Sequence, residues 1–202
     1  MKLGLITDVH EHVEHLRVAL EYCRKARVDR IVFIGDVVAM TERIEETCRL
    51  LADARVVGVW GNHDFGLCFN VSDEMRKRYS STVIDFMTSL KPRLEIDGCL
   101  FAHIEPWLDP ENIADLWYFG GPANVVENLD KIFGAGSHRF IFAGHYHQWL
   151  LAQPTGVSDW NGDQPVQLND GRYFAVVGAL CEGWMATFDT ETGWLVPVNV
   201  SQ

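Results

Sequence analysis

The sequence predicts an α/β fold in which two β-sheets form a sandwich flanked by helices. Up to residue 60, apolar runs of strand length alternate with segments of helical period, which is typical of parallel strands joined by right-handed crossovers. From residue 173 on, three apolar runs follow one another with a Glu191-Thr192-Gly193 turn, which is typical of antiparallel strands. A chain of 202 residues can enclose a substantial core, so we expect one domain over residues 1–202.

The N-terminal part is predicted to alternate strands and helices. Apolar residues at i, i+3 and i+4 spacing mark the helices, and short continuous apolar runs mark buried strands. The predicted elements are strands at 2–7, 30–34 and 56–60 and helices at 12–26 and 41–53.

After residue 64 the pattern changes. Pro92 ends a predicted helix, and Asp97-Gly98 is a strong hairpin turn. The predicted elements are a loop at 65–73, a helix at 74–90, hairpin strands at 94–96 and 99–102, an irregular aromatic-rich segment at 105–124 and a helix at 123–134.

The C-terminal part is predicted to be mainly strands. Residues 153–171 are rich in Gly, Pro, Asp and Asn, so we expect a long loop or hairpin flap there. The predicted strands lie at 139–143, 148–152, 173–177, 184–188 and 194–200.

Charge and composition reduce the range of functions that the protein could have. The net charge of -11 disfavours unassisted binding to nucleic acid or an anionic membrane. The five cysteines form no CxxC pair, so we expect reduced core thiols rather than disulfides. The chain enters a strand without a charged and apolar leader, and no apolar run approaches the ~20 residues of a membrane span. We therefore expect a cytoplasmic protein; the oligomeric state stays open.

Five predicted strands end in side chains that can bind metals. The residues concerned are Asp8 and His10, Asp36, Asn62 with His63, His103, and His145 with His147. Carboxylates, amides and histidines at the ends of buried strands fit a ligand site better than a core. Gly35, Gly61 and Gly144 neighbour three of these positions and would let the backbone approach an ion or a phosphate.

The residue types indicate two divalent cations. Imidazole suits zinc, iron, manganese and nickel, and a carboxylate can bridge two ions. In extended chain, residues i and i+2 point to the same side, so Asp8 with His10, and His145 with His147, could each converge on one centre. Two ions about 3.5–4 Å apart would clamp a phosphoryl oxygen and acidify a water.

The ordered motifs DxH, GD, GNHD, a lone His after a strand, and GHxH resemble the calcineurin-like metallophosphoesterase superfamily. The resemblance spans Asp8 to His147, and the small size is similar to the compact bacterial-type phosphodiesterases of that superfamily. It implies a four-layer α/β/β/α fold and hydrolysis of a small phosphate ester. It also implies two divalent ions, for which manganese, iron, zinc and nickel are the candidates.

The resemblance also implies a role for each site residue. It places Asp8, His10 and His147 on the first metal, Asn62, His103 and His145 on the second, and Asp36 on both. His63 would protonate the leaving oxygen or stabilise the phosphoryl oxygens, with Asp64 holding its ring. A hydroxide bridging the two metals would attack phosphorus.

The sequence departs from the family pattern in two places. The protein phosphatases of the superfamily carry arginines after GD and before GNH, whereas here Val37-Val38-Ala39 follows Asp36 and Trp60 precedes Gly61. This departure favours a phosphodiester, or another substrate that needs less positive charge, over a dianionic monoester. The stretch 177–183 stands where many relatives have an Asn-Pro-Gly-Ser-like turn, and its Glu182 is unusual.

Several other residues have two interpretations. His12, beside the first motif, and Trp160, in the 153–171 segment, are candidate substrate-binding residues, although a surface or packing role would also explain them. His15 lies off the predicted apolar helix face, which indicates a surface position. The basic run 76–78 is either a solvated face or a phosphate-capturing patch. Trp107, Trp117, Tyr118 and Phe119 could form an aromatic wall beside the site or pack as core.

The sequence is compatible with three functions. The first is a di-metal phosphodiesterase. The second is a phosphomonoesterase acting on a small molecule, a nucleotide or a phosphoprotein. The third is a protein-interaction scaffold without catalysis, as in the retromer subunit that resembles this fold. The presence of His63 and all seven ligands favours an enzyme.

Overall fold

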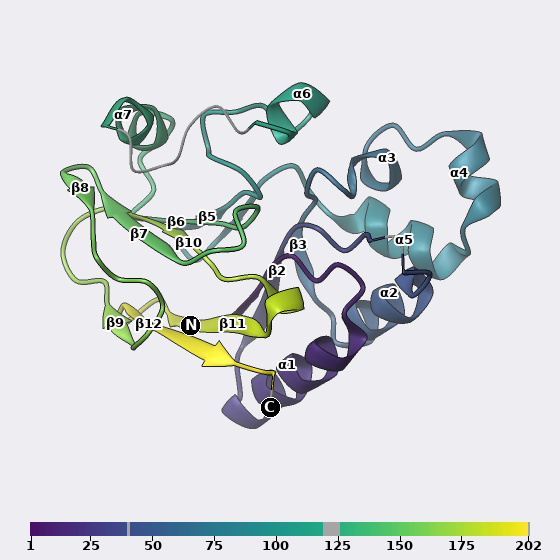
Figure 1. The fold of residues 1–202 in the computed structure, drawn as a ribbon, viewed down its shortest axis with the longest axis horizontal. Helices are drawn as coiled ribbons and strands as arrows, with labels where there is room; N and C mark the ends of the chain where they lie inside the picture. Colours follow the sequence, from purple (N-terminus) through teal and green to yellow (C-terminus); the bar gives the residue numbers. More distant parts are fainter. Residues whose placement is uncertain (40, 119–125, 202) are drawn as a thin grey trace.

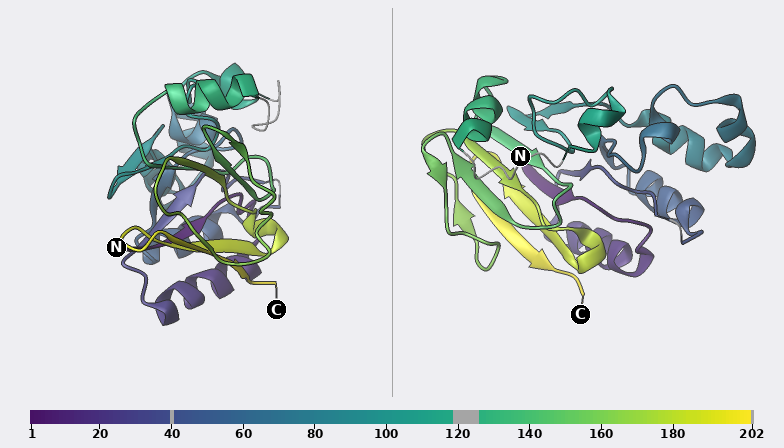
Figure 2. Two further views of the ribbon diagram at one scale, coloured as in Figure 1. Left: turned by 90° about the vertical axis from the view of Figure 1, so that its left-hand side faces the viewer. Right: turned by 45° about the horizontal axis from the view of Figure 1, so that its top comes forward.

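The computed structural model describes residues 1–39, 41–118 and 126–201. Within them, two six-stranded sheets form a sandwich with helices on both outer sides (Figures 1 and 2). The predicted α/β sandwich and its four layers are therefore confirmed.

The elements follow the predicted order closely. In the first half they are β1 (Lys2–Ile6), α1 (Val13–Ala26), β2 (Arg30–Ile34), α2 (Ile44–Asp53), β3 (Val57–Val59), α3 (Phe65–Cys68), α4 (Asp73–Arg78), α5 (Ser81–Ser89), β4 (Leu94–Ile96) and β5 (Cys99–Phe101). In the second half they are α6 (Ile113–Leu116), α7 (Val126–Gly134), β6 (Phe140–Ala143), β7 (Leu150–Gln153), β8 (Gly156–Val157), β9 (Val166–Gln167), β10 (Tyr173–Val176), η1 (Leu180–Glu182), β11 (Trp184–Asp189) and β12 (Trp194–Asn199).

Each sheet mixes parallel and antiparallel strands. The first has the order β3-β2-β1-β11-β12-β9, and the second β4-β5-β6-β10-β7-β8. Strands β1, β2 and β3 are parallel, and β11 joins β1 antiparallel. In the second sheet, β6 pairs parallel with both β5 and β10.

Three hydrophobic layers hold the sandwich together. Side chains alternate along a strand, so Leu5 of β1 packs between the sheets while Ile6 packs under the helices. Helices α1, α2 and α5 cover the outer face of the first sheet, and α7 covers that of the second. Because both faces of the central strands are buried, these strands read as continuous apolar runs.

The sandwich brings the ends of five strands together. The loop after β1 bonds to the loop after β2, with the Asp8 N–H donating to the Gly35 carbonyl at 2.9 Å. The loops after β5 and β6 are joined by the Gly144 N–H and the His103 carbonyl at 3.1 Å. The His103 Nδ1 lies 2.7 Å from the Ile34 carbonyl and connects the two sheets. All five strand ends therefore meet at one place.

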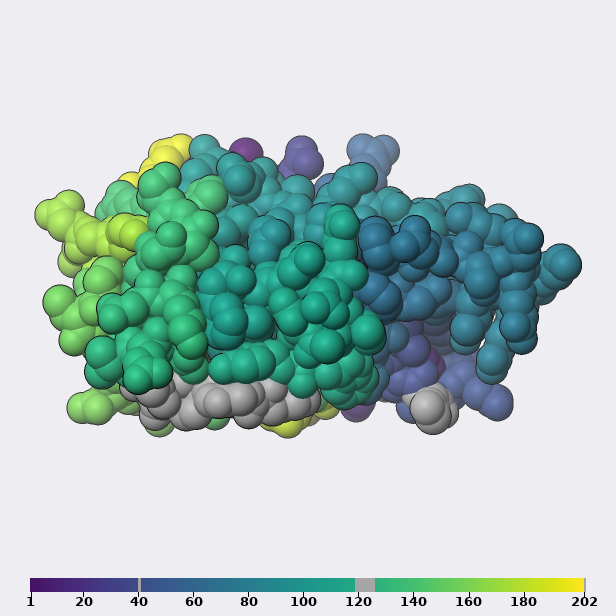
Figure 3. Space-filling view, turned by 90° about the horizontal axis from the view of Figure 1, so that it is seen from above, coloured from purple at the N-terminus to yellow at the C-terminus, as the bar shows by residue number. Residues whose placement is uncertain are grey.

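The segment after β3 differs from the prediction. The expected loop at 65–73 contains α3, and the expected helix at 74–90 is two helices. Ser72 caps α4 through the Met75 N–H, and Ser80 caps α5 through the Val83 N–H. A serine at an N-cap satisfies an N–H left free at a helix start, so Ser80 begins a new helix instead of continuing the first. Seen from above, α4 projects at one end of the molecule (Figure 3).

The segment predicted as a flap is built into both sheets. Its β8 pairs with β7, and its β9 pairs with β12. Trp160, between them, packs against Trp149 with ring centroids 5.5 Å apart and contacts the core between the sheets. The expected loop or hairpin flap therefore includes a hairpin of β7 and β8, and its β9 joins it to the other sheet.

The predicted helix at 123–134 is present as α7 in its described part, residues 126–134. Phe119 of the aromatic segment, and the positions 120–125, lie outside the described residues. The rest of the expected irregular segment contains the short helix α6. Among the helices described, none is long and apolar enough to cross a membrane.

Candidate metal centre

The structure gathers all seven predicted ligands at the meeting point of the strand ends. Their backbone, however, is not extended: Asp8, His10, Asp36, His145 and His147 all have positive φ, between 43° and 71°. Non-glycine residues take this conformation rarely, and such residues cluster at functional sites. We expected each i, i+2 pair to share one centre. This expectation is wrong for His145 and His147, because the His145 ring faces Asn62 and the His147 ring faces Asp8.

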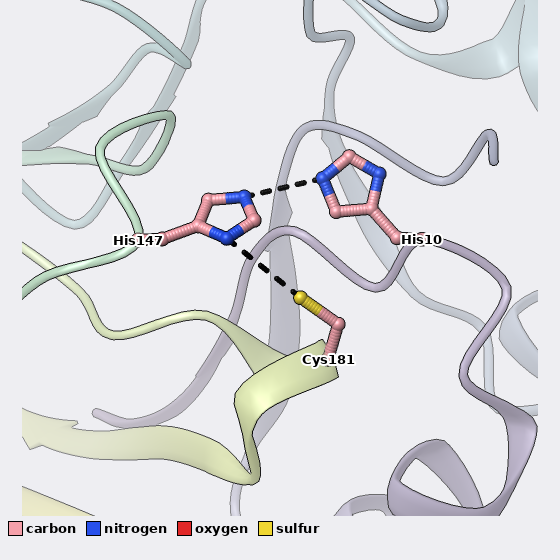
Figure 4. Close-up of side chains that lie close together, drawn as sticks. All are labelled: His10, His147 and Cys181. Atoms are coloured by element: carbon pink, nitrogen blue, oxygen red, sulfur yellow. Dashed lines mark hydrogen bonds between the residues drawn. The ribbon is translucent and has the colours of Figure 1, made fainter.

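The first group of side chains joins the loops after β1 and β6. The His10 Nε2 lies 3.2 Å from the His147 Nε2, and the His147 Nε2 lies 3.3 Å from the Asp8 Oδ1. Figure 4 shows the two imidazoles facing each other from separate loops. Three donor atoms thus converge on one point.

The second group joins the loops after β3, β5 and β6. The Asn62 Oδ1 lies 3.0 Å from the His103 Nε2 and 3.0 Å from the His145 Nδ1. All three side chains are buried. His145 and His147 therefore contribute to different groups.

Asp36 stands between the two groups. Its Oδ2 lies 3.8 Å from the His10 Nε2 of the first group and 3.3 Å from the His103 Nε2 of the second. Its Oδ1 accepts the His63 N–H at 3.0 Å, which fixes the carboxylate. One carboxylate oxygen can thus face both groups.

Two glycines allow the loops to pack this closely. A Cβ at Gly61 would collide with the Asp36 carboxylate, and one at Gly144 would collide with the Thr7 hydroxyl and the Asp8 carboxylate. The expected close approach therefore occurs, but the structure shows it toward the side chains of candidate ligands. Any larger residue at these positions would displace them.

The donor geometry fits divalent metal ions. Two ligands bound at 2.0–2.1 Å in tetrahedral geometry lie roughly 3.3–3.4 Å apart, close to the donor separations in both groups. The Asp8 Oδ1 is buried and accepts no hydrogen bond from the described residues, whereas its Oδ2 accepts bonds from the Thr7 hydroxyl and the His145 N–H. A buried carboxylate oxygen of this kind needs a positive charge beside it, which the protonated His147 at 3.3 Å supplies without metal and a metal cation would supply in its place.

The acidic and basic groups of the site shift one another's pKa values. Burial raises the pKa of Asp36, but His103 outweighs this effect and lowers it to about 2. Burial lowers the pKa of His103, but Asp36 raises it to about 9. The Asp8 carboxylate raises the pKa of His147 to about 11, while burial lowers that of His145 to about 4. Without metal, protons on His103 and His147 balance the two carboxylates.

His63 lies at the rim of a pocket of about 420 Å³. Besides five of the seven candidate ligands, the lining comprises His63 and Trp117. The His63 ring stands 5.0 Å from the His10 ring and 5.1 Å from the Trp117 ring, between centroids. Burial lowers the pKa of His63. A larger hollow of about 930 Å³ lies beside α1 and α2 and includes none of the candidate ligands.

Asp64 does not hold the His63 ring, contrary to our expectation. It is fully buried, and its Oδ2 accepts the N–H groups of Asp36 and Gly61 at 2.8 and 3.0 Å. Its Oδ1 accepts those of Val37 and Val38 at 2.8 and 3.1 Å. Asp64 thus fixes the backbone around Asp36.

The two predicted substrate-binding residues lie outside the pocket lining. His12 caps α1 and stacks on His15 with centroids 3.7 Å apart, and Trp160 packs against Trp149. These contacts favour the packing interpretation of both residues over the substrate-binding one. Of the described aromatic residues in that segment, Trp117 lines the pocket, whereas Trp107 and Tyr118 pack against the core.

Sequence reasoning missed two residues around the last motif. Cys181, expected as a core thiol, lies 3.8 Å from the His147 Nδ1 (Figure 4). Glu105 is fully buried and accepts the Tyr146 hydroxyl at 2.5 Å, which anchors the loop between His145 and His147. Neither has a spacing signal; only Glu182, next to Cys181, stood out in the sequence.

Comparison with known proteins identifies the family. Residues 1–193 match the family model described as the calcineurin-like phosphoesterase superfamily domain. The chain belongs to this superfamily, as its motifs predicted.

Two archaeal proteins show sequence similarity. An uncharacterised protein of Methanocaldococcus jannaschii is 27% identical over 161 residues, 72% of this chain and 62% of that protein. This chain thus spans less than two thirds of that relative. A protein of the same organism named a phosphodiesterase is 28% identical over 157 residues, 78% of this chain and 80% of the relative.

Solved structures show the same fold. A metallophosphoesterase from Sphaerobacter thermophilus matches with a TM-score of 0.79 and 22% identity, covering 100% of this chain and 88% of that one. A structure described as a novel archaeal phosphodiesterase matches with a TM-score of 0.58 and 18% identity, covering 98% and 99%. These likenesses show that the fold is shared over nearly the whole chain.

Proposed function

We propose that this phosphoesterase is a di-metal phosphodiesterase acting on a small substrate. The observation that carries the proposal is the pair of ligand groups that meet at Asp36, with His63 beside them on the pocket rim. The first ion would be held by Asp8, His10 and His147, the second by Asn62, His103 and His145, with Asp36 on both. Manganese, iron, zinc and nickel suit these donors.

The charge of the pocket supports a diester. Among the described residues that line it, none is Lys or Arg, and the undescribed positions 40, 119–125 and 202 contain neither in the sequence. A phosphomonoester carries up to two negative charges at neutral pH and a diester only one. A pocket whose fixed positive charge would come from metals alone therefore favours the diester.

Each residue has a distinct task in this proposal. Bound divalent ions supply charge neutralisation and an acidified water. The carboxylates of Asp8 and Asp36 and the imidazoles position these ions. His63, held between His10 and Trp117, hydrogen-bonds the phosphoryl oxygens or gives its proton to the leaving oxygen. The bond from phosphorus to that oxygen breaks as the water oxygen bonds to phosphorus.

The test compares two chromogenic esters. Metal-free protein is loaded in turn with manganese, nickel and zinc and incubated with bis-p-nitrophenyl phosphate and p-nitrophenyl phosphate. We expect turnover of both with a higher kcat/KM for the diester, and none after chelation.

Two outcomes would contradict different parts of the proposal. If protein shown to contain two metals turns over neither ester, the proposed activity is wrong. A higher kcat/KM for the monoester would overturn only the diester preference.

A further inference from the structure

The two ring nitrogens of His147 face different surroundings. Its Nε2 points into the first ligand group, 3.3 Å from the Asp8 Oδ1. Its Nδ1 points away, toward the 3-10 turn η1 (Figure 4). An imidazole that binds a metal through Nε2 must carry its proton on Nδ1. The partner of Nδ1 therefore decides whether Nε2 is available.

Two neighbouring residues of η1 stand at this Nδ1. The Cys181 Sγ lies 3.8 Å from it, and the Glu182 Oε1 lies 3.4 Å from it. Cys181 is half-buried, while the Glu182 side chain is 55% exposed. A sulfur and a carboxylate thus offer the Nδ1–H acceptors on the side of the ring opposite the candidate metal.

The turn that carries them is fastened to the first ligand loop. The Leu180 N–H donates to the Thr7 carbonyl at 2.8 Å, and the Cys181 N–H donates to the Asp8 carbonyl at 3.0 Å. His15 of α1, expected at the surface, instead lies with its Nδ1 2.9 Å from the Leu180 carbonyl. The acceptors for His147 are therefore held in register with Asp8, a ligand of the same group.

We propose that Cys181 and Glu182 are positioning residues that accept the Nδ1–H of His147 and direct its Nε2 toward the first metal. The proposal rests on the metal centre of the proposed function. Outer partners of metal-bound histidines fix the tautomer and ring orientation, and their loss typically costs 10–100-fold in metal affinity. The effect here should fall on the first ion only, because the second group does not contain His147.

The experiment measures the binding of zinc to the metal-free full chain by competition with a chromophoric chelator. The variants are Glu182→Ala, Glu182→Gln, Cys181→Ala and the double alanine variant. Glu74→Ala, an exposed glutamate on α4, is the matched control. Because Glu182 is exposed and no backbone group of the described residues bonds to its side chain, its variants should fold even if Cys181→Ala does not.

We expect two zinc ions in the wild type. One dissociation constant should rise about 10-fold in Glu182→Ala and up to about 100-fold in the double variant, with the other constant unchanged. Glu182→Gln, which keeps an acceptor oxygen, should lose less than Glu182→Ala. A second readout is long-range ¹H–¹⁵N NMR of the zinc-loaded protein, in which His147 should carry its proton on Nδ1.

Two results would overturn the inference. Equal zinc affinities in the wild type and in Glu182→Ala would remove Glu182 from this role, and an Nδ1 without a proton would remove both residues. If the wild type takes up no zinc at all, the proposed metal centre itself is wrong, and this inference with it.

Discussion

Within the site, the residues differ in how they are held. Five of the seven candidate ligands have positive φ, and the ligands are fixed by short contacts to one another, as between Asn62 and His103 at 3.0 Å. His63 is exposed, and the hydrogen bond that it makes within the described part of the chain comes from its backbone N–H, which donates to Asp36 at 3.0 Å. This difference separates residues that build the centre from one that can respond to the substrate.

The role of His63 can be tested by removing its ring. His63→Ala should keep both metals but lower turnover of bis-p-nitrophenyl phosphate roughly 10²–10⁴-fold, the usual scale for a positioned acid–base group. The measurement is kcat with the metal content determined on the same sample. His138→Ala, which removes a histidine paired with Glu95 outside the pocket, is the control. Unchanged turnover in His63→Ala would exclude it from the mechanism.

The shifted histidines predict a pH effect on metal binding. In the metal-free protein, His103 and His147 have pKa values raised to about 9 and about 11, so both hold a proton at pH 7. Binding must displace these protons. The affinity of each site should therefore rise with pH, about tenfold per unit for each proton displaced, until the pH passes the raised pKa.

Calorimetric titration in buffers of different ionisation enthalpy checks this prediction. The apparent binding enthalpy should depend on the buffer, with about two protons released for two ions at pH 7. An enthalpy independent of the buffer would contradict the proton balance of the site.

At the scale of elements, the loop after β2 depends on a residue of the loop after β3. Asp64 gathers four backbone N–H groups from both loops around Asp36. The sequence motif predicts that Asp64 matters, but not how, because hydrogen bonds between separate loops leave no spacing signal. For the same reason the sequence did not indicate a role for Cys181, because its contact with His147 joins distant parts of the chain.

Asp64→Asn separates the two roles considered for this residue. An amide cannot accept all four N–H bonds, so the metal-free protein should lose about 2–3 kcal/mol of unfolding free energy, the scale of hydrogen bonds to a buried charged group. Urea unfolding measures this loss, with the exposed Asp85→Asn as the control. Normal stability with reduced turnover would restore the original expectation that Asp64 acts on His63.

The segment between β7 and β10, which carries Trp160, leads to another prediction. Trp160 packs on Trp149 and the inter-sheet core, so Trp160→Ala should reduce stability. Truncation of a fully buried Trp costs about 3–5 kcal/mol, and for this half-buried one we expect about 1–2 kcal/mol. The KM for bis-p-nitrophenyl phosphate should stay unchanged. A raised KM at unchanged stability would return Trp160 to the substrate site.

At the scale of the whole molecule, most of the architecture could be predicted from the sequence. Continuous apolar runs marked the central strands because both of their faces are buried. The break between α4 and α5 could not be read from apolar spacing, since it depends on the cap at Ser80. Nor could the pattern assign β5 and β6 to a different sheet from β1–β3. That arrangement is what lets His103 and His145 face Asn62 from the opposite sheet.

The central claim is that this convergence of two sheets builds a centre for two ions joined by Asp36. A crystal structure of the metal-loaded protein, with the ions located by anomalous scattering, tests it most directly. We predict two peaks about 3.5–4 Å apart, one among Asp8, His10 and His147 and the other among Asn62, His103 and His145, with Asp36 touching both. A single peak, or two peaks that do not share Asp36, would contradict the account.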